Sequence, residues 1–387
     1  MAHCIPFDSV LVVCLIFPKI LVLINVAKTV KYTPDWNSLD TRPLPEWYDN
    51  AKVGIFIHWG TFSVPAFGSE WFWYSWKGSN PNPQVVEFMN KNYPPDFTYA
   101  DFAEQFHAEF YDPNEWADIF QASGAKYIVL TSKHHEGYTM WPSKYSWNWN
   151  AMDVGPHRDL LGDLASAIRN RTKIKRQTVT GNGIPCKHGS FYTCSDHYNP
   201  GHLVTHKWEN CFTLDKNSWG YRRSASVNDY ISIEELLKEV VTTVSTGGNV
   251  LINTGPTSYG KIAPIMEERL RQMGSWLNVN GEAIYNSVPW KYQNDTSNKD
   301  VWYTASKDGK LVYASLLVWP TNSTTILLGA PISTSDTKVS MLGREAPINW
   351  RSSEQPPGII LDITDVKAYS LPSDWTWVFK LENIDVK

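Results

Sequence analysis

Short runs of consecutive apolar residues punctuate the first two thirds of the chain. Residues 52–57 (KVGIFI), 126–131 (KYIVLT) and 249–253 (NVLIN) are rich in β-branched and aromatic side chains at neighbouring rather than alternate positions. This pattern is typical of strands buried on both faces, as in a parallel sheet. Polar, histidine or glycine residues follow each run. In α/β architectures the carboxyl ends of parallel strands carry the chemistry, so these residues are candidates for a site.

Helical periodicity separates the apolar runs. Apolar residues at 236, 237, 240, 241 and 244 predict a helix over residues 233–245, and the glycines at 247–248 supply its C-cap. Residues 99–123 predict two helical pieces broken near Pro113, and residues 264–277 predict another helix. Alternating strands and helices indicate a parallel α/β domain.

The pattern changes near residue 290. Short strand-like runs separated by Gly, Ser, Asn and Pro continue to the C-terminus, which indicates an antiparallel β-sandwich of roughly 100 residues. We therefore divide the chain into an α/β domain over residues 28–287 and a sandwich domain over residues 288–387.

Residues 140–230 interrupt the α/β pattern. They contain almost no Val- or Ile-rich run, whereas a complete eight-stranded barrel needs several more buried strands in this region. The stretch is either a long irregular insertion or the place where sequence is missing.

The N-terminus begins with an apolar segment. Residues 10–17 (VLVVCLIF) have the length of the apolar core of a secretory signal and are too short to span a bilayer, although Asp8 and Lys19 flank them. We interpret residues 1–27 as a signal peptide rather than a buried strand or a weak membrane anchor. Three glycosylation sequons, at Asn170, Asn294 and Asn322, fit the same pathway and predict a secreted or lysosomal protein without a membrane span.

Composition narrows the class of function. Hydrophobic residues make up 42% of the chain and charged residues 19%, which excludes a disordered protein. A net charge of −4 argues against a nucleic-acid partner. The 19 Trp residues exceed what one core needs and suit a ligand with flat apolar faces, such as a sugar; a Trp-rich core is the plainer alternative.

Cysteine spacing restricts metal and redox chemistry. The five Cys include no C-x-x-C pair, so neither a zinc ribbon nor a thioredoxin-type site is supported. Spacing alone leaves the pairing of the last three Cys open. We predict a local disulfide between Cys186 and Cys194, because they flank a short Gly- and Ser-containing loop of a protein expected in the secretory pathway.

Three clusters combine imidazole, carboxylate and indole groups. They are His58-Trp59-Gly60, Ser69-Glu70-Trp71-Phe72-Trp73 and Lys133-His134-His135-Glu136-Gly137. Such groups hydrogen-bond hydroxyls and cover the apolar face of a polyhydroxylated ligand, although each cluster could also be structural. Because His134 and His135 are adjacent, a strand would point them to opposite faces, so we expect no metal site. Glu209, beside Lys207 and Trp208, is by position a general acid or a surface salt-bridge residue.

Longer motifs extend over most of the chain. They are Leu44-Pro45-Glu46-Trp47-Tyr48, residues 54–60 (GIFIHWG), residues 68–73 (GSEWFW), residues 125–130 with 133–137 (AKYIVL and KHHEG), residues 206–209 (HKWE), residues 218–223 (SWGYRR), residues 248–257 and residues 280–285 (NGEAIY). With these motifs the sequence resembles the α-L-fucosidases of glycoside hydrolase family 29, most closely their secreted, plasma-type animal members.

The resemblance implies a (β/α)8-like catalytic barrel followed by a β-sandwich. It also implies retaining hydrolysis of terminal α-linked L-fucose on glycoproteins and glycolipids, through a covalent glycosyl-enzyme and without a cofactor. His58, Glu70, Trp71, His134 and His135 match the fucose-binding positions of the family. Glu209 matches the residue proposed as acid/base in animal members. Fucosylated glycans are thus the expected partners, and family enzymes are often homo-oligomers.

One departure from the family changes this expectation. Family members carry roughly 80 further residues between the helix after the His-His motif and the Cys-rich segment, including two barrel strands and a Trp-x-Asp motif that bears the nucleophile. Here residues 167–178 run almost directly into Cys186, and no Trp-x-Asp stands at this place. We expect an incomplete barrel with an internal deletion near residues 173–183.

Three hypotheses follow from the resemblance and the gap. The first is an α-L-fucosidase of the secretory pathway. The second is a catalytically impaired variant that at most binds fucose, because the nucleophile Asp is missing. The third is a misfolded product without function.

Overall fold

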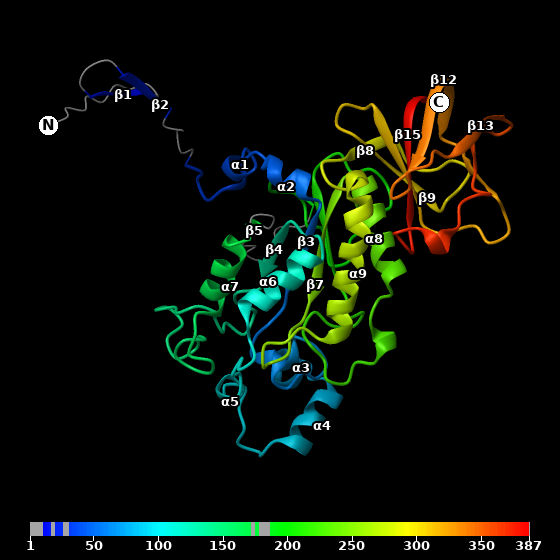
Figure 1. Ribbon diagram of the computed structural model, residues 1–387. Coiled ribbons are helices and arrows are strands. Elements are labelled where there is room, and N and C mark those ends of the chain that lie inside the picture. Colours follow the sequence, from blue (N-terminus) through cyan, green and yellow to red (C-terminus); the bar gives the residue numbers. More distant parts are fainter. Residues whose placement is uncertain (1–10, 17–19, 26–30, 172–174, 178–185, 387) are drawn as a thin grey trace.

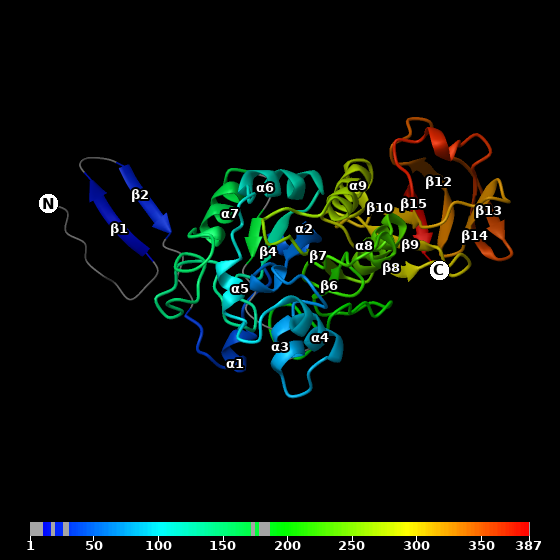
Figure 2. The same ribbon diagram turned by 90° about the horizontal axis from the view of Figure 1, so that it is seen from below.

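The chain forms an N-terminal hairpin, an α/β body and a C-terminal β-sandwich (Figure 1). The computed structural model describes residues 11–16, 20–25, 31–171, 175–177 and 186–386. Strands β1 (Leu11–Ile16) and β2 (Ile20–Asn25) pair with each other in an antiparallel hairpin, which lies apart from the body in both Figure 1 and Figure 2. The interpretation of residues 1–27 as a signal peptide stays a prediction, and part of that range lies outside the described residues.

A parallel sheet forms the centre of the body. Its strand order is β5-β4-β3-β7-β6, and every neighbouring pair is parallel. The strands are β3 (Val53–Ile57), β4 (Tyr127–Leu130), β5 (Lys175–Gln177), β6 (Trp208–Thr213) and β7 (Gly248–Thr254). Five strands among the described residues, rather than eight, confirm the expectation of an incomplete barrel.

The three strands predicted from apolar runs are confirmed as β3, β4 and β7, and they lie side by side. Strand β6 escaped prediction because Glu209 and Asn210 interrupt the apolar residues of its sequence, WENCFT. All six of its residues are nevertheless buried, because β7 covers one edge and backbone around Tyr192 and His197 hydrogen-bonds to the other. The pairing across the chain, not local composition, makes this segment a strand.

Helices cover the sheet on the side seen in Figure 1. Four helices of ten or more residues pack against the sheet or against one another. They are α6 (Pro113–Ala122), α7 (Leu160–Arg169), α8 (Ile233–Ser245) and α9 (Pro264–Asn280). Their ends are encoded locally: the Ser232 hydroxyl and the Glu235 carboxylate form a capping box for α8, and α6 begins at the predicted break, Pro113. The remaining α-helices are α1 (Trp36–Leu39), α2 (Glu46–Ala51), α3 (Phe72–Lys77), α4 (Pro83–Asn92) and α5 (Asp101–Glu104).

The C-terminal part is a sandwich of two antiparallel sheets, as predicted. The larger sheet has the order β12-β15-β10-β9-β8 and the smaller one β11-β14-β13. The strands are β8 (Val288–Asn294), β9 (Val301–Ala305), β10 (Leu311–Leu316), β11 (Thr325–Leu328), β12 (Pro331–Met341), β13 (Asn349–Glu354), β14 (Pro357–Asp362) and β15 (Trp377–Val386). Residues of both sheets share one apolar core, which includes Tyr303, Leu328 and Phe379.

The sandwich is joined to the body through α9. The indole N–H of Trp276 donates to the carbonyl of Thr376 at 2.8 Å, and the amide of Asn280 donates to the Ser373 hydroxyl at 2.8 Å. Both donors are buried, so these hydrogen bonds fix the sandwich against the helix.

The predicted local disulfide is present. Cys186 and Cys194 are bonded with their Cα atoms 4.8 Å apart, and Cys211 is a free, buried thiol. Among the sequons, Asn170 and Asn322 are exposed. Asn294 differs, because its side-chain nitrogen donates to the carbonyls of Lys299 and Val301.

Candidate functional site

Three adjacent strands of the parallel sheet bring the predicted binding residues together. His58 directly follows β3, His134 and His135 follow β4, and Asn253 is the penultimate residue of β7. The rings of His58 and His134 lie 6.0 Å apart, centre to centre. Because the carboxyl ends of parallel strands meet at one edge, residues nearly 200 positions apart converge here.

His58 is held in a defined tautomer. Its Nδ1 lies 2.8 Å from Oδ1 of Asn253, whose own amide nitrogen donates to Thr213 and to the carbonyl of Trp219. The amide oxygen can only accept, so Nδ1 of His58 carries the proton and Nε2 is left as an acceptor. Burial lowers the pKa of His58 to about 3, against an ordinary value of 6.5, and keeps the ring neutral at physiological pH.

His134 and His135 differ in their surroundings although they are adjacent. Nδ1 of His134 contacts the Glu136 carboxylate at 2.9 Å, which orients this buried ring. His135 is exposed and stacks on Trp71 with ring centres 4.4 Å apart. Its pKa is lowered by desolvation and by the neighbouring His134. The indole of Trp71 remains 43% exposed, so an apolar face is open to a ligand.

Glu70 links two loops at the site. One of its carboxylate oxygens accepts from the backbone N–H groups of Trp219, at 2.9 Å, and Gly220, at 3.3 Å, and from the Ser218 hydroxyl. The ring of Trp219 in turn lies 5.2 Å from that of His58. Glu70 therefore positions a second indole beside the histidines while keeping its other oxygen without a hydrogen bond in this loop.

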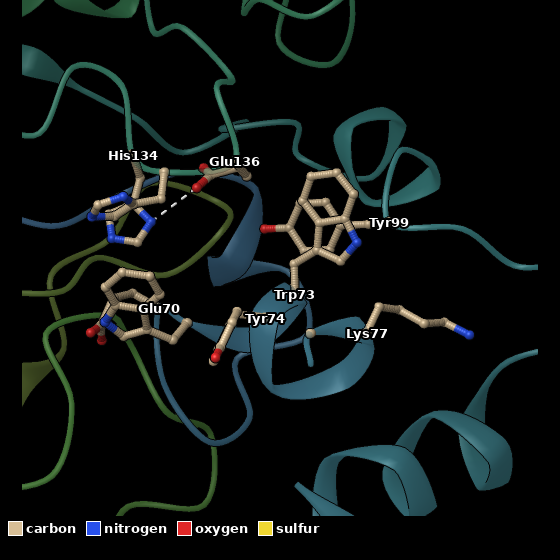
Figure 3. A pocket seen from close by; sticks show the side chains of 10 residues that line it. Glu70, Trp73, Tyr74, Lys77, Tyr99, His134 and Glu136 are labelled. Carbon is tan, nitrogen blue, oxygen red and sulfur yellow. Dashed lines mark hydrogen bonds and ion pairs between the residues drawn. The ribbon is translucent and has the colours of Figure 1, made fainter. Parts of the chain in front are cut away.

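A cavity of about 400 Å³ opens beside these groups (Figure 3). Its volume lies within the range of about 300–1,000 Å³ that is usual for small-molecule sites. Glu70, His134 and Glu136 lie at one end of it, and Lys77 lies at the other, with the ring of Trp73 between them. The cavity thus combines hydrogen-bonding groups with open aromatic faces.

The structure does not bring Glu209 into this cluster. Glu209 is the second residue of β6 and pairs in register with Asn249, whereas the backbone N–H of His58 bonds to Thr254, five residues further along β7. At about 3.3 Å per residue, the two ends of the sheet are separated by roughly 16 Å. Glu209 lies at the amino end, away from the histidines.

The surroundings of Glu209 are closed. Its side chain is 1% exposed, and one carboxylate oxygen accepts a hydrogen bond of 2.7 Å from each of the hydroxyls of Tyr48 and Tyr127. Burial raises the pKa of Glu209 above its ordinary value, and the two hydroxyls oppose this shift. In this structure Glu209 therefore faces neither the histidine cluster nor the solvent, and its role as acid/base stays a prediction of the resemblance.

Two Trp-x-Asp triplets do occur in the chain, but neither aspartate lies at the histidine cluster. Asp49, in α2, binds the ammonium groups of Lys207 at 2.8 Å and Lys52 at 3.1 Å near the amino end of the sheet. Asp118, in α6, pairs with Arg171. The part of the sequence expected to carry the nucleophile is the gap near residues 173–183, most of which lies outside the described residues.

Sequence reasoning missed three contributors to the site, namely Asn253, Trp219 and the supporting role of Glu136. The sequence could have indicated Asn253, because this residue is the last one of a predicted buried strand. Trp219 follows β6, the strand that composition did not reveal. Within the described residues, no group of three or more His, Cys, Asp or Glu side chains is placed to hold a metal ion.

Comparison with known proteins gives matches over most of the chain. The profile described as Alpha-L-fucosidase matches residues 20–181 and 171–282, and the profile described as Alpha-L-fucosidase C-terminal domain matches residues 293–382. The chain is 45% identical to Alpha-L-fucosidase of Branchiostoma floridae, covering 94% of this chain and 99% of the relative. It is 47% identical to human Plasma alpha-L-fucosidase, with 92% and 93% covered.

Solved structures agree with the fold. The crystal structure of Thermotoga maritima alpha-fucosidase in complex with a mechanism-based inhibitor superposes with a TM-score of 0.78 at 26% identity, over 91% of this chain and all of that one. A complex of the same bacterial protein with fucose gives a TM-score of 0.75.

Two features of these matches bear on the expected gap. The main profile matches in two segments that meet at residues 171–181. The alignments with the Branchiostoma and human plasma relatives run over 447 and 437 positions, more than the 387 residues of this chain. Each alignment therefore contains many positions that the relative fills and this chain does not.

Proposed function

This chain belongs to the α-L-fucosidase family of glycoside hydrolases, and from that premise we propose that it binds terminal α-linked L-fucose at the carboxyl ends of β3, β4 and β7. The observation that carries the proposal is that Glu70, Trp71, His134 and His135 line one open cavity, with the ring of His58 next to that of His134. These are the residues that the family resemblance assigns to fucose.

The chemistry of the cluster suits a deoxy-sugar. Nε2 of neutral His58 can accept a hydrogen bond from a sugar hydroxyl, and the Glu70 carboxylate can accept another. Trp71 and Trp219 present indole rings to the same space as the histidines, suitable for the methyl group and C–H face of fucose. Fixed, partly buried hydrogen-bonding groups discriminate strongly among hydroxyl patterns, because a wrong sugar leaves them unpaired.

We propose that turnover is impaired. Retaining hydrolysis needs a nucleophilic carboxylate and an acid/base carboxylate about 5–5.5 Å apart across the glycosidic bond. Glu209 is sequestered at the opposite end of the sheet, and the sequence lacks a Trp-x-Asp at the gap. The split profile match and the long alignments support an internal deletion as the cause. Binding without efficient hydrolysis is the consequence.

The test compares this chain with a version in which the corresponding segment of the human plasma relative is inserted between Arg171 and Cys186. We expect the restored chain to hydrolyse a chromogenic α-L-fucoside at least about a thousandfold faster, because loss of a nucleophile commonly costs several powers of ten. A restored chain whose inserted Trp-x-Asp aspartate is changed to asparagine controls for repair of the fold alone. Equal turnover of this chain and the restored chain would show that another carboxylate serves as the nucleophile.

Titration with L-fucose separates the two halves of the proposal. Quenching or enhancement of the fluorescence of the site indoles should report saturable binding of L-fucose by this chain. Absence of saturable binding, in a preparation shown to be folded, would refute the recognition half whatever the turnover.

We also propose that the chain enters the secretory pathway. Exposure of Asn170 and Asn322 favours glycans at these two sequons, whereas the hydrogen bonds of the Asn294 side-chain nitrogen disfavour a glycan there. Mass spectrometry of peptides from chain secreted by animal cells, with and without an endoglycosidase, checks this; a glycan at Asn294 alone would contradict it. No helix within the described part of the chain is long and apolar enough to cross a membrane.

A further inference from the structure

We propose that a second cavity, next to the first and separated from it by Trp73, holds the sugar unit to which the fucose is attached. The inference rests on the proposed recognition of fucose and adds to it the residues that select the remainder of the glycan. This second cavity has a volume of about 620 Å³ and is lined by Trp73, Lys77, Asp96, Thr98, Ala100 and Trp149, among others.

The two cavities adjoin each other. Trp73, Lys77 and Tyr99 line both of them, so sugar units bound in the two cavities would lie on either side of these shared residues. Figure 3 shows Trp73 and Tyr99 between the histidine end of the first cavity and Lys77. Each cavity has the volume of a small-molecule site, so together they exceed what a single monosaccharide needs.

The shared wall has the form of a sugar platform. The indole of Trp73 stacks on Tyr99 with ring centres 4.6 Å apart and an interplanar angle of 5°, which fixes its orientation. Trp73 is still 42% exposed, so its other face is available to the C–H face of a pyranose. Exposed Lys77, Asp96 and Thr98 surround it with donors and acceptors for hydroxyl groups.

A hydrogen bond ties the second cavity to the fucose residues. The indole N–H of Trp149 donates to the backbone carbonyl of Glu136 at 2.9 Å, and the Glu136 side chain orients His134. Both cavities are therefore built on the same loop after β4. The walls of both cavities come from two unbroken segments, residues 70–100 and 133–149. Both segments precede the expected deletion near residues 173–183.

The direction of the glycan follows from the same geometry. His58 stands at the strand end and is partly buried, whereas Trp71 and His135 are exposed at the mouth. In the proposed orientation the hydroxyls of fucose contact the histidines and its glycosidic oxygen points toward the exposed residues Trp71 and His135. The second cavity offers an adjoining space in which the next pyranose can stack on Trp73.

The experiment measures the dissociation constants of methyl α-L-fucoside and of a fucosyl-galactose disaccharide by titration calorimetry on the full chain. We expect the disaccharide to bind about tenfold more tightly, which corresponds to one additional stacked ring. Ala100→Trp fills the second cavity without touching the first, so it should bring the two constants to within about twofold of each other while the monosaccharide value stays the same. Asp96→Ala should reduce the difference by about threefold through loss of one hydrogen bond.

The matched control is Ala346→Trp, which adds the same side chain at an exposed position of the sandwich. It should preserve the preference for the disaccharide. Equal affinity of the unmodified chain for both sugars, or a preference that survives Ala100→Trp, would overturn the second site while leaving fucose recognition intact. Failure of both sugars to bind the folded chain would instead refute the proposed function, and the second site with it.

Discussion

The two ends of the parallel sheet both gather ionisable and aromatic side chains, yet they are organised in opposite ways. At the carboxyl end, Glu70 and His134 border an open cavity, with the exposed indoles of Trp71 and Trp73 beside them. At the amino end, the Glu209 carboxylate is enclosed by Tyr48 and Tyr127, and its second oxygen faces the thiol of Cys211 at 3.6 Å. At the carboxyl end acceptors face a cavity, whereas at the amino end the Glu209 carboxylate is hydrogen-bonded internally.

The difference separates the proposed binding role of the carboxyl end from a structural role at the amino end. A buried carboxylate is tolerated only when its hydrogen-bonding capacity is filled, because an unpaired buried polar group costs stability. Lys207 and Lys52 share Asp49 in the same region, which adds to the internal pairing. The type of side chain alone therefore does not identify a functional residue in this protein. The side chain must also be accessible from the cavity.

The largest effect that tests this contrast is expected from Glu209. Glu209→Ala should lower the free energy of unfolding by about 3 kcal/mol, because two buried tyrosine hydroxyls lose their acceptor. Glu209→Gln keeps an acceptor oxygen and should cost about 1 kcal/mol. Urea denaturation measures both. If Glu209→Gln left stability unchanged but abolished fucose binding by the folded chain, Glu209 would act at the site. The two ends of the sheet would then not differ in role.

A smaller effect on stability, but a direct one on binding, is expected at His58. His58→Ala should weaken L-fucose binding by about tenfold, because one hydrogen bond from a sugar hydroxyl is worth about 1 kcal/mol or slightly more. His157→Ala removes an exposed imidazole elsewhere and serves as the control. Fluorescence titration gives both affinities; equal losses in the two variants would indicate a non-specific effect of removing histidine.

The dependence of stability on pH should distinguish the two ends most finely. Burial lowers the pKa of His58 from 6.5 to about 3, so the unfolded chain binds the extra proton and stability should fall as the pH drops from 6.5 toward 3. Burial, together with the charge of Lys52, lowers the pKa of Lys207 from 10.5 to about 7, so stability should rise as the pH increases from 7 to 10.5.

Unfolding in urea across these two pH ranges provides the measurement. His58→Ala should flatten the acidic slope only, and Lys207→Met should flatten the alkaline slope only. Should either variant change both slopes, the two clusters would be coupled through the sheet rather than independent.

Much of the fold could be predicted because it is encoded locally. The strands at 53–57, 127–130 and 248–254 have apolar runs, the helix at 233–245 has a capping box and an apolar stripe, and the sandwich has short strands between turn residues. Strand β6 could not be predicted, because its burial depends on neighbours on both edges that come from other parts of the chain.

The sequence by itself determined which side chains could recognise a sugar: His58, Glu70, Trp71, His134 and His135 all stand in motifs that a single reading reveals. Only the tertiary structure decided how those side chains are used. In the folded chain Asn253 accepts a hydrogen bond from His58, Trp73 lies between two cavities, and Glu209 lies buried at the amino end of the sheet. The physical reason is that register and strand order fix which end of the sheet a residue occupies, and neither is written in the residues next to it.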